Sequence, residues 1–160
     1  MTGPHEQPDD DVLLELGKLT WTAINFEDVV YFVCQCIDPT NDYRGTATGT
    51  RIKQAREALQ AQPDEALRRR AEAWLEVASQ GLAERHAVLH SEPVSFVPLA
   101  ADLTPVDLDR LLAHFPRDRS RGPVHTPLTV SELRAIRWRL EAARGGWEEL
   151  ATELYTQKVW

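Results

Sequence analysis

The feature that most constrains this chain is residues 64–91, a stretch without proline that is rich in Ala, Leu, Glu and Arg. These residue types favour helix, and a proline would interrupt one. At 3.6 residues per turn, the stretch predicts a helix of about seven turns. Apolar side chains recur along it at helical spacing and form one stripe: Ala71, Trp74, Leu75, Ala78, Leu82 and Leu89. Such a stripe must be covered by other elements.

Other segments show the same kind of pattern. Residues 10–37 carry apolar groups mostly three or four apart, which predicts one long helix, kinked or divided near Gly17–Thr22. A further helix is expected over residues 50–61, with Thr50 as its N-cap. A short helix is expected over residues 104–115, where Thr104 precedes a first-turn proline.

The last helix is expected over residues 129–158. Thr129 and Glu132 have the spacing of a capping box at its start, and Gly145–Gly146 is expected to bend it. Pro93 and Pro98 exclude a regular helix between the two halves of the chain, so only a short extended segment is expected there.

Together these patterns predict an all-α fold, an up-and-down helical bundle with a C-terminal long helix. No sheet beyond a short hairpin is expected. Residues 1–9 are expected to be a flexible tail, and residues 10–160 a single helical domain, with residues 92–160 extending a core of residues 10–91. The residues expected to be buried together are Ile24, Val30, Val33, Trp74, Leu75 and Leu82.

Composition limits the function classes. The 160 residues carry a net charge of -7, so a general nucleic-acid-binding coat is excluded, and contact with RNA would need local patches. The runs Arg68–Arg70 and Arg117–Arg121 are interpreted as solvated surface. Cys34 and Cys36 are expected to be reduced core residues. No secretory signal or spanning segment is visible, which predicts a cytoplasmic protein without membrane contact.

The chemistry gathers at Arg85, His86 and His90. Arg85 falls within the apolar stripe, where its permanent charge must meet a carboxylate, a cleft or a second subunit. His86 and His90 are four residues apart and share a helix face. Imidazoles move protons near neutral pH and a guanidinium holds phosphate, a combination suited to phosphodiester cleavage. The alternative is that these three side chains only stabilise the C-terminus of the helix.

This segment resembles the HEPN family, whose small helical bundles carry Arg, a polar residue, and His after four to six residues. Arg85, His86 and His90 fit that pattern, with His86 where Asn is commonest, and the surrounding Ala83–Ser91 is similar to uncharacterised bacterial members. The likeness is specific over about ten residues and architectural over residues 10–91. Residues 104–160 lie outside it. Glu92 stands where one branch of toxins has Tyr, which argues against that branch and its tyrosine-modifying antitoxin.

The resemblance implies a metal-independent endoribonuclease without cofactor, acting as a homodimer and cleaving RNA through the 2′-hydroxyl. It further implies a toxin or phage-defence effector with an antitoxin or regulatory protein as partner. Because other HEPN members are inactive, the alternative is a non-catalytic helical interaction module, a dimer scaffold or regulator. A third hypothesis is a DNA-binding regulator that uses the arginines of residues 129–144, although no clear helix-turn-helix partner precedes them.

Overall fold

The protein is a bundle of helices with one short hairpin. The computed structural model describes residues 10–89, 91–94, 111–114 and 129–157. The elements within those ranges are α1 (Asp10–Ile37), α2 (Thr48–Leu59), α3 (Glu65–Leu89), β1 (Ser91–Val94), β2 (Leu111–His114), α4 (Val130–Ala143) and α5 (Trp147–Thr156). The predicted all-α class is confirmed, since the strands form only a two-stranded antiparallel pair.

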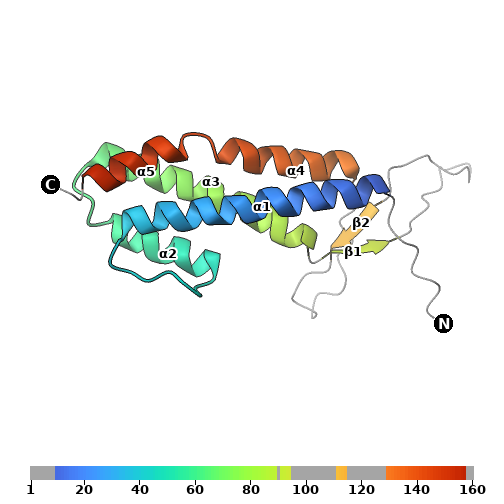
Figure 1. Ribbon diagram of the computed structural model, residues 1–160, viewed down its shortest axis with the longest axis horizontal. Helices are drawn as coiled ribbons and strands as arrows, with labels where there is room; N and C mark the ends of the chain where they lie inside the picture. The colour runs from blue at the N-terminus through green and yellow to red at the C-terminus, as the bar shows by residue number, and fades with distance from the viewer. Residues whose placement is uncertain (1–9, 90, 95–110, 115–128, 158–160) are drawn as a thin grey trace, which may run out of the picture.

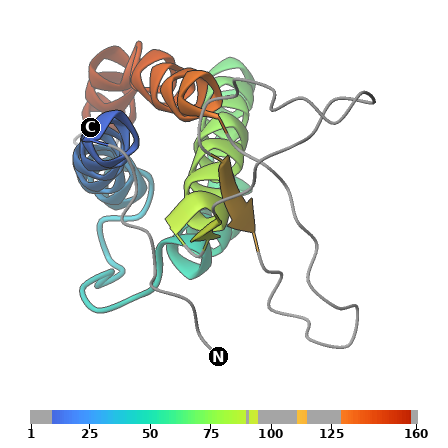
Figure 2. The same cartoon turned by 90° about the vertical axis from the view of Figure 1, so that its right-hand side faces the viewer.

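Helix α1 organises the bundle, because each of the other four helices contacts it. Figure 1 shows α1 in front, α4 and α5 following one another along its upper side, and α2 below. Viewed from the end, α1 and α3 lie on opposite sides, with α4 and α5 above them (Figure 2). Helix α3 runs opposite to the rest. The loop after α1 returns along the bundle, so α2 runs in the same direction as α1 (Figure 1).

The core lies along the inner face of α1, where Phe26, Val30 and Val33 are fully buried. Leu75 is buried as the sequence predicts, whereas Trp74 and Leu82, which were also expected to be buried, are only partly buried against the core. The prediction for Ile24 is wrong: it is 47% exposed. Cys34 and Cys36 are buried and form no disulfide, and burial raises the pKa of the Cys34 thiol to about 12. That thiol is therefore unsuited to act as a nucleophile.

Several expected boundaries need correction. Helix α1 continues unbroken through Gly17, and α2 begins at Thr48 after Ala47 rather than after Thr50. The helix predicted over 104–115 is wrong for Leu111–His114, which forms strand β2. Residues 104–110 and 115 lie outside the described ranges. A short apolar run does not distinguish helix from strand by periodicity alone, and here pairing with β1 decides.

The C-terminal helix begins and bends as expected. The capping box of Thr129 and Glu132 is present at the start of α4. The bend at Gly145–Gly146 separates α4 from α5, and Gly146 has a φ of 74°, a left-handed value that glycine adopts without strain.

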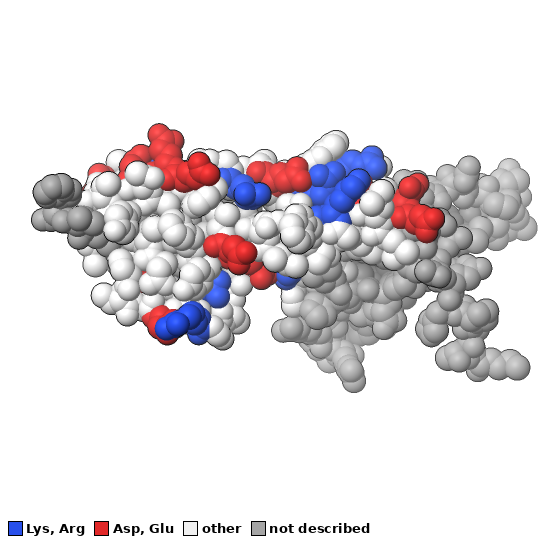
Figure 3. Space-filling model, in the orientation of Figure 1, with Lys and Arg blue, Asp and Glu red and all other residues white. Residues whose placement is uncertain are grey.

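A buried carboxylate joins α1 to α4. Glu15 is only 4% exposed, and its oxygens lie 3.0 Å from Lys18 Nζ and 3.4 Å from Arg137 Nε. Arg134 Nε lies 3.8 Å away. Figure 3 shows basic side chains gathered over the adjoining N-terminal halves of α1 and α4. The Lys18 hydrogen bond, more than the nearby charges, holds the Glu15 pKa below its usual range against the opposing effect of burial.

None of the described helices combines the length and hydrophobicity required to cross a membrane.

Two glycines should respond oppositely to replacement by alanine. A Cβ on Gly17 would meet nothing within 4 Å, whereas one on Gly81 would lie 2.8 Å from Cδ2 of the buried Leu140. Gly17→Ala should therefore stabilise the protein by about 0.5–1 kcal/mol. Gly81→Ala should be neutral or destabilising, because α3 and α4 must separate or Leu140 must repack. Urea unfolding of both variants measures the difference, and equal effects would contradict the close α3–α4 packing.

The Glu15 cluster predicts acid sensitivity. Because the pKa of Glu15 is lowered in the folded state, its stabilising contribution is present above the usual carboxylate range. That contribution is lost as the pH falls through the folded-state pKa. Glu15→Gln should cost about 1–3 kcal/mol at pH 7 and progressively less as the pH falls. Thermal melts between pH 3 and pH 7 test this, with the exposed Glu57→Gln as the control expected to change little at either pH.

Candidate functional site

Arg85 lies in the last turns of α3, on the side that faces α1. Its side chain is 18% exposed, and its Nη1 lies 3.0 Å from Oε1 of Glu27 on α1. Of the three environments that the sequence allows for this charge, the structure provides a carboxylate. The pair is half-buried, so it fixes the guanidinium at the seam between α1 and α3.

One donor of the guanidinium is buried without a partner among the described residues. The guanidinium carries five N–H donors. Its Nε is buried and has no hydrogen-bond partner in the part of the chain that the structure describes. The Nε atoms of Arg51 and Arg56 are in the same condition, so this feature does not distinguish Arg85 from the other arginines.

Of the two histidines of the motif, only His86 lies among the described residues. His86 is exposed in the last turn of α3, next to Arg85. Its position near the C-terminus of the helix also fits a simple dipole role. His90 lies outside the described residues, so its geometry relative to Arg85 stays a prediction. Val88, between them, is buried and anchors the end of the helix.

The hairpin brings a third histidine to this end of α3. In the antiparallel register of β1 and β2, His114 is the partner of Ser91, the residue directly after His90. From the sequence, His114 was expected to lie in the helix over 104–115, apart from the motif, and was given no role. The expected helix over 104–115 concealed the strand pairing, and no sequence signal indicates that register. Glu27 was missed as well, although a carboxylate within the apolar helix 10–37 was a visible signal.

Several of the other basic groups form ion pairs with carboxylates. In the run Arg68–Arg70, Arg69 pairs with Glu65 and Arg70 with Glu153, which supports the interpretation as surface. On α4, Arg137 pairs with Glu15 and Glu141, and Arg139 pairs with Glu84. Two of the arginines that a DNA-binding regulator would use, Arg137 and Arg139, are therefore held by carboxylates of the protein itself. The run Arg117–Arg121 lies outside the described residues.

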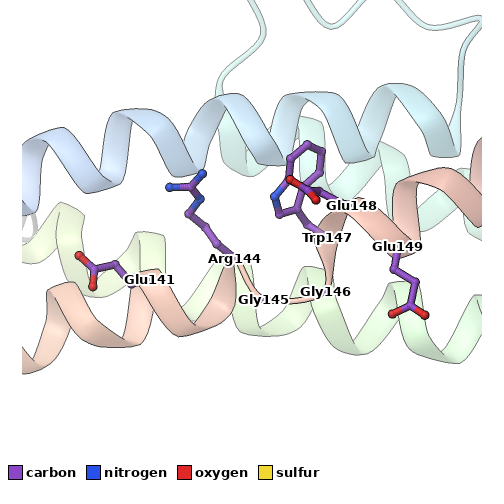
Figure 4. A pocket seen from close by; sticks show the side chains of 7 residues that line it. All are labelled: Glu141, Arg144, Gly145, Gly146, Trp147, Glu148 and Glu149. Atoms are coloured by element: carbon purple, nitrogen blue, oxygen red, sulfur yellow. The ribbon is translucent and has the colours of Figure 1, made fainter.

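A hollow of about 460 Å³ lies at the bend between α4 and α5. It is lined by Glu141, Arg144, Gly145, Gly146, Trp147, Glu148 and Glu149. Figure 4 shows that these side chains do not converge, because Arg144 and Trp147 point toward α1 and Glu149 points away from it. A ligand site needs polar groups aimed at one point. Within the described ranges, no three His, Cys, Asp or Glu side chains group together as a metal site would need.

No model of a known protein family matches the sequence, and no curated protein or solved structure matches it significantly. The resemblance to HEPN proteins therefore rests on the residues around Arg85 and on the helical architecture.

The Arg85–Glu27 pair should contribute measurable coupling to stability. A double-mutant cycle of Arg85→Met and Glu27→Gln is expected to give about 1 kcal/mol, because both side chains are half-buried. The matched control is the exposed pair Arg69–Glu65, expected to give about 0.3 kcal/mol. Urea unfolding measures both. Equal couplings would show that Arg85 is as solvated as a surface arginine.

Proposed function

We propose that the chain is a HEPN-like, metal-independent endoribonuclease, acting in the cytoplasm as a toxin or phage-defence effector, with Arg85, His86 and His90 as its catalytic residues. The observation that carries the proposal is the placement of Arg85. It is held by Glu27 at the seam of two helices, in the turn that carries His86 and leads to His90.

The roles follow from the chemistry of each group. Arg85 holds the scissile phosphate and stabilises the charge that builds on it. His90 moves the proton of the ribose 2′-hydroxyl or of the leaving oxygen. His86, where the family commonly has Asn, orients or assists. The RNA supplies its own nucleophile, so the products end in a 2′,3′-cyclic phosphate.

A homodimer belongs to this proposal. In HEPN enzymes the motifs of two subunits face each other, so a second Arg85 and a second His90 would complete the cleft. The acidic net charge of -7 is compatible with this arrangement only if the RNA is bound locally. The proposal also includes an antitoxin or regulatory protein as a partner, because the resemblance to HEPN proteins implies one.

The second candidate is a non-catalytic interaction module. The ion pair with Glu27 favours it, because that pair gives Arg85 a purely structural reason to be where it is. Under this reading the motif closes the bundle and the function lies on the outer surface.

Cleavage by purified variants separates the two candidates. His90→Ala should lower the rate of RNA cleavage by about 10²–10⁴-fold while the melting temperature stays unchanged. Arg85→Lys keeps a positive charge for Glu27 but loses the two-pronged contact with phosphate, so cleavage should fall without unfolding. His86→Asn should be milder. A chelator should have no effect, and deoxyribose at the cut site should block the reaction.

Two results would count against the enzyme. If His90→Ala cuts as fast as the parent, the site assignment is wrong. If the parent cuts nothing in a broad panel of RNAs, the interaction module becomes the better proposal.

A further inference from the structure

The outer face of α1 carries several large apolar side chains that are exposed in the described part of the chain. Five of the eight exposed large apolar residues in that part belong to α1: Leu13, Leu14, Trp21, Ile24 and Phe32. Trp21 is 69% exposed. The remaining three are single residues on different helices, which is ordinary for a soluble surface. A gathering on one helix is not ordinary and marks a contact surface.

The spacing on this face is that of a helix that pairs with another helix. Leu14, Lys18, Trp21, Asn25, Asp28 and Phe32 follow one another at steps of four, three, four, three and four. Residues at this heptad spacing form one seam along a helix. We call these six residues the α1 seam. It extends over about 27 Å, at 1.5 Å per residue.

The α1 seam is self-complementary when read in opposite directions. About its middle, near Ala23, Leu14 corresponds to Phe32, Lys18 to Asp28, and Trp21 to Asn25. Two copies crossed antiparallel would therefore pair apolar with apolar at both ends, and positive with negative inside. An isologous two-fold contact makes each of these pairs twice.

The charged positions are available for such pairing. The side chain of Lys18 is 46% exposed and gives one hydrogen bond, to Glu15, from an ammonium with three donors. Asp28 is exposed and forms no ion pair within the described residues. At the centre, Asn25 donates to the Trp21 carbonyl at 2.9 Å, which leaves its amide oxygen to accept the indole N–H of a partner. A polar residue at such a position fixes register.

We infer that α1 is a homodimerisation helix, and that two copies of this chain pair antiparallel through the α1 seam. The occupant is a second copy because the charges and the apolar residues of the seam complement themselves. Phe32 packs edge-on against Trp147 with ring centroids 5.8 Å apart, so Leu14 of the second copy would meet a fixed aromatic surface.

This inference does not rest on the proposed function. At 100° per residue, the α1 seam lies about 140° around α1 from Glu27, so the pairing leaves Arg85 away from the two-fold axis. It is a different contact from one that joins two Arg85 motifs. If both formed, each chain would have two interfaces and the assembly would be a tetramer or a filament.

Light scattering and sedimentation of the full chain test the contact at about 100 µM. Asp28→Lys places like charges opposite each other twice, and Trp21→Ala removes the centre, so each should raise the dissociation constant at least about tenfold and halve the mass. Trp138→Ala, a tryptophan of similar exposure on α4, is the control and should change nothing. Thermal melts confirm that the variants fold.

Disulfide trapping tests the direction of pairing. A Leu14→Cys chain mixed with a Phe32→Cys chain should form a cross-linked heterodimer, while either chain alone should not, since like positions lie about 27 Å apart in the antiparallel pair. A parent that stays monomeric, variants that stay dimeric, or cross-links only between like positions would each overturn the inference. Loss of the α1 seam contact with RNA cleavage intact would show that the two contacts are independent, since the proposed function needs only the pairing of two Arg85 motifs.

Discussion

The fold depends on one constraint: a single helix, α1, must pack against all four of the other described helices. Helix α1 contacts α2, α3, α4 and α5, and its inner side chains are nearly all apolar. Two carboxylates interrupt this pattern, and each binds a different neighbour. Glu15 joins α1 to α4 through Arg137, and Glu27 joins α1 to α3 through Arg85. These ion pairs act as register marks, since sliding either helix by one turn would strand a half-buried charge.

The helices could be predicted from the spacing of apolar and capping residues, whereas the hairpin, which depends on pairing between two distant strands, could not. The stripe on α3, the length of α1 and the capping box of α4 follow from local spacing, and the structure has all three. The hairpin does not, because strand β2 exists only through its register with β1. Ile24 failed for a related reason: a helix with apolar residues on several sides does not reveal which side the core will take.

The candidate site shows the same division. The sequence left a carboxylate, a cleft or a second subunit open as the environment of Arg85, and the structure supplies the carboxylate of Glu27. It could not indicate which acid would serve, because α1 and α3 are far apart in sequence. It could not reveal that His114 would be paired beside the end of the motif either. Local sequence patterns do not predict contacts between distant segments. Here such contacts bring the Glu27 carboxylate to Arg85 and place His114 opposite Ser91 in the hairpin.

The dependence of α1 on α4 also shapes how the chain acquires its structure. Arg137 and Glu15 are 122 residues apart in sequence, yet they share the ion cluster that joins the two helices. During synthesis, α1 emerges long before α4 and α5, which cover part of its surface. At about 5–20 residues per second, the interval is roughly 6–24 s. For that time an apolar helix is without its cover, so the newborn chain depends on chaperones, or on early packing of α1 with α2 and α3, to stay out of aggregates.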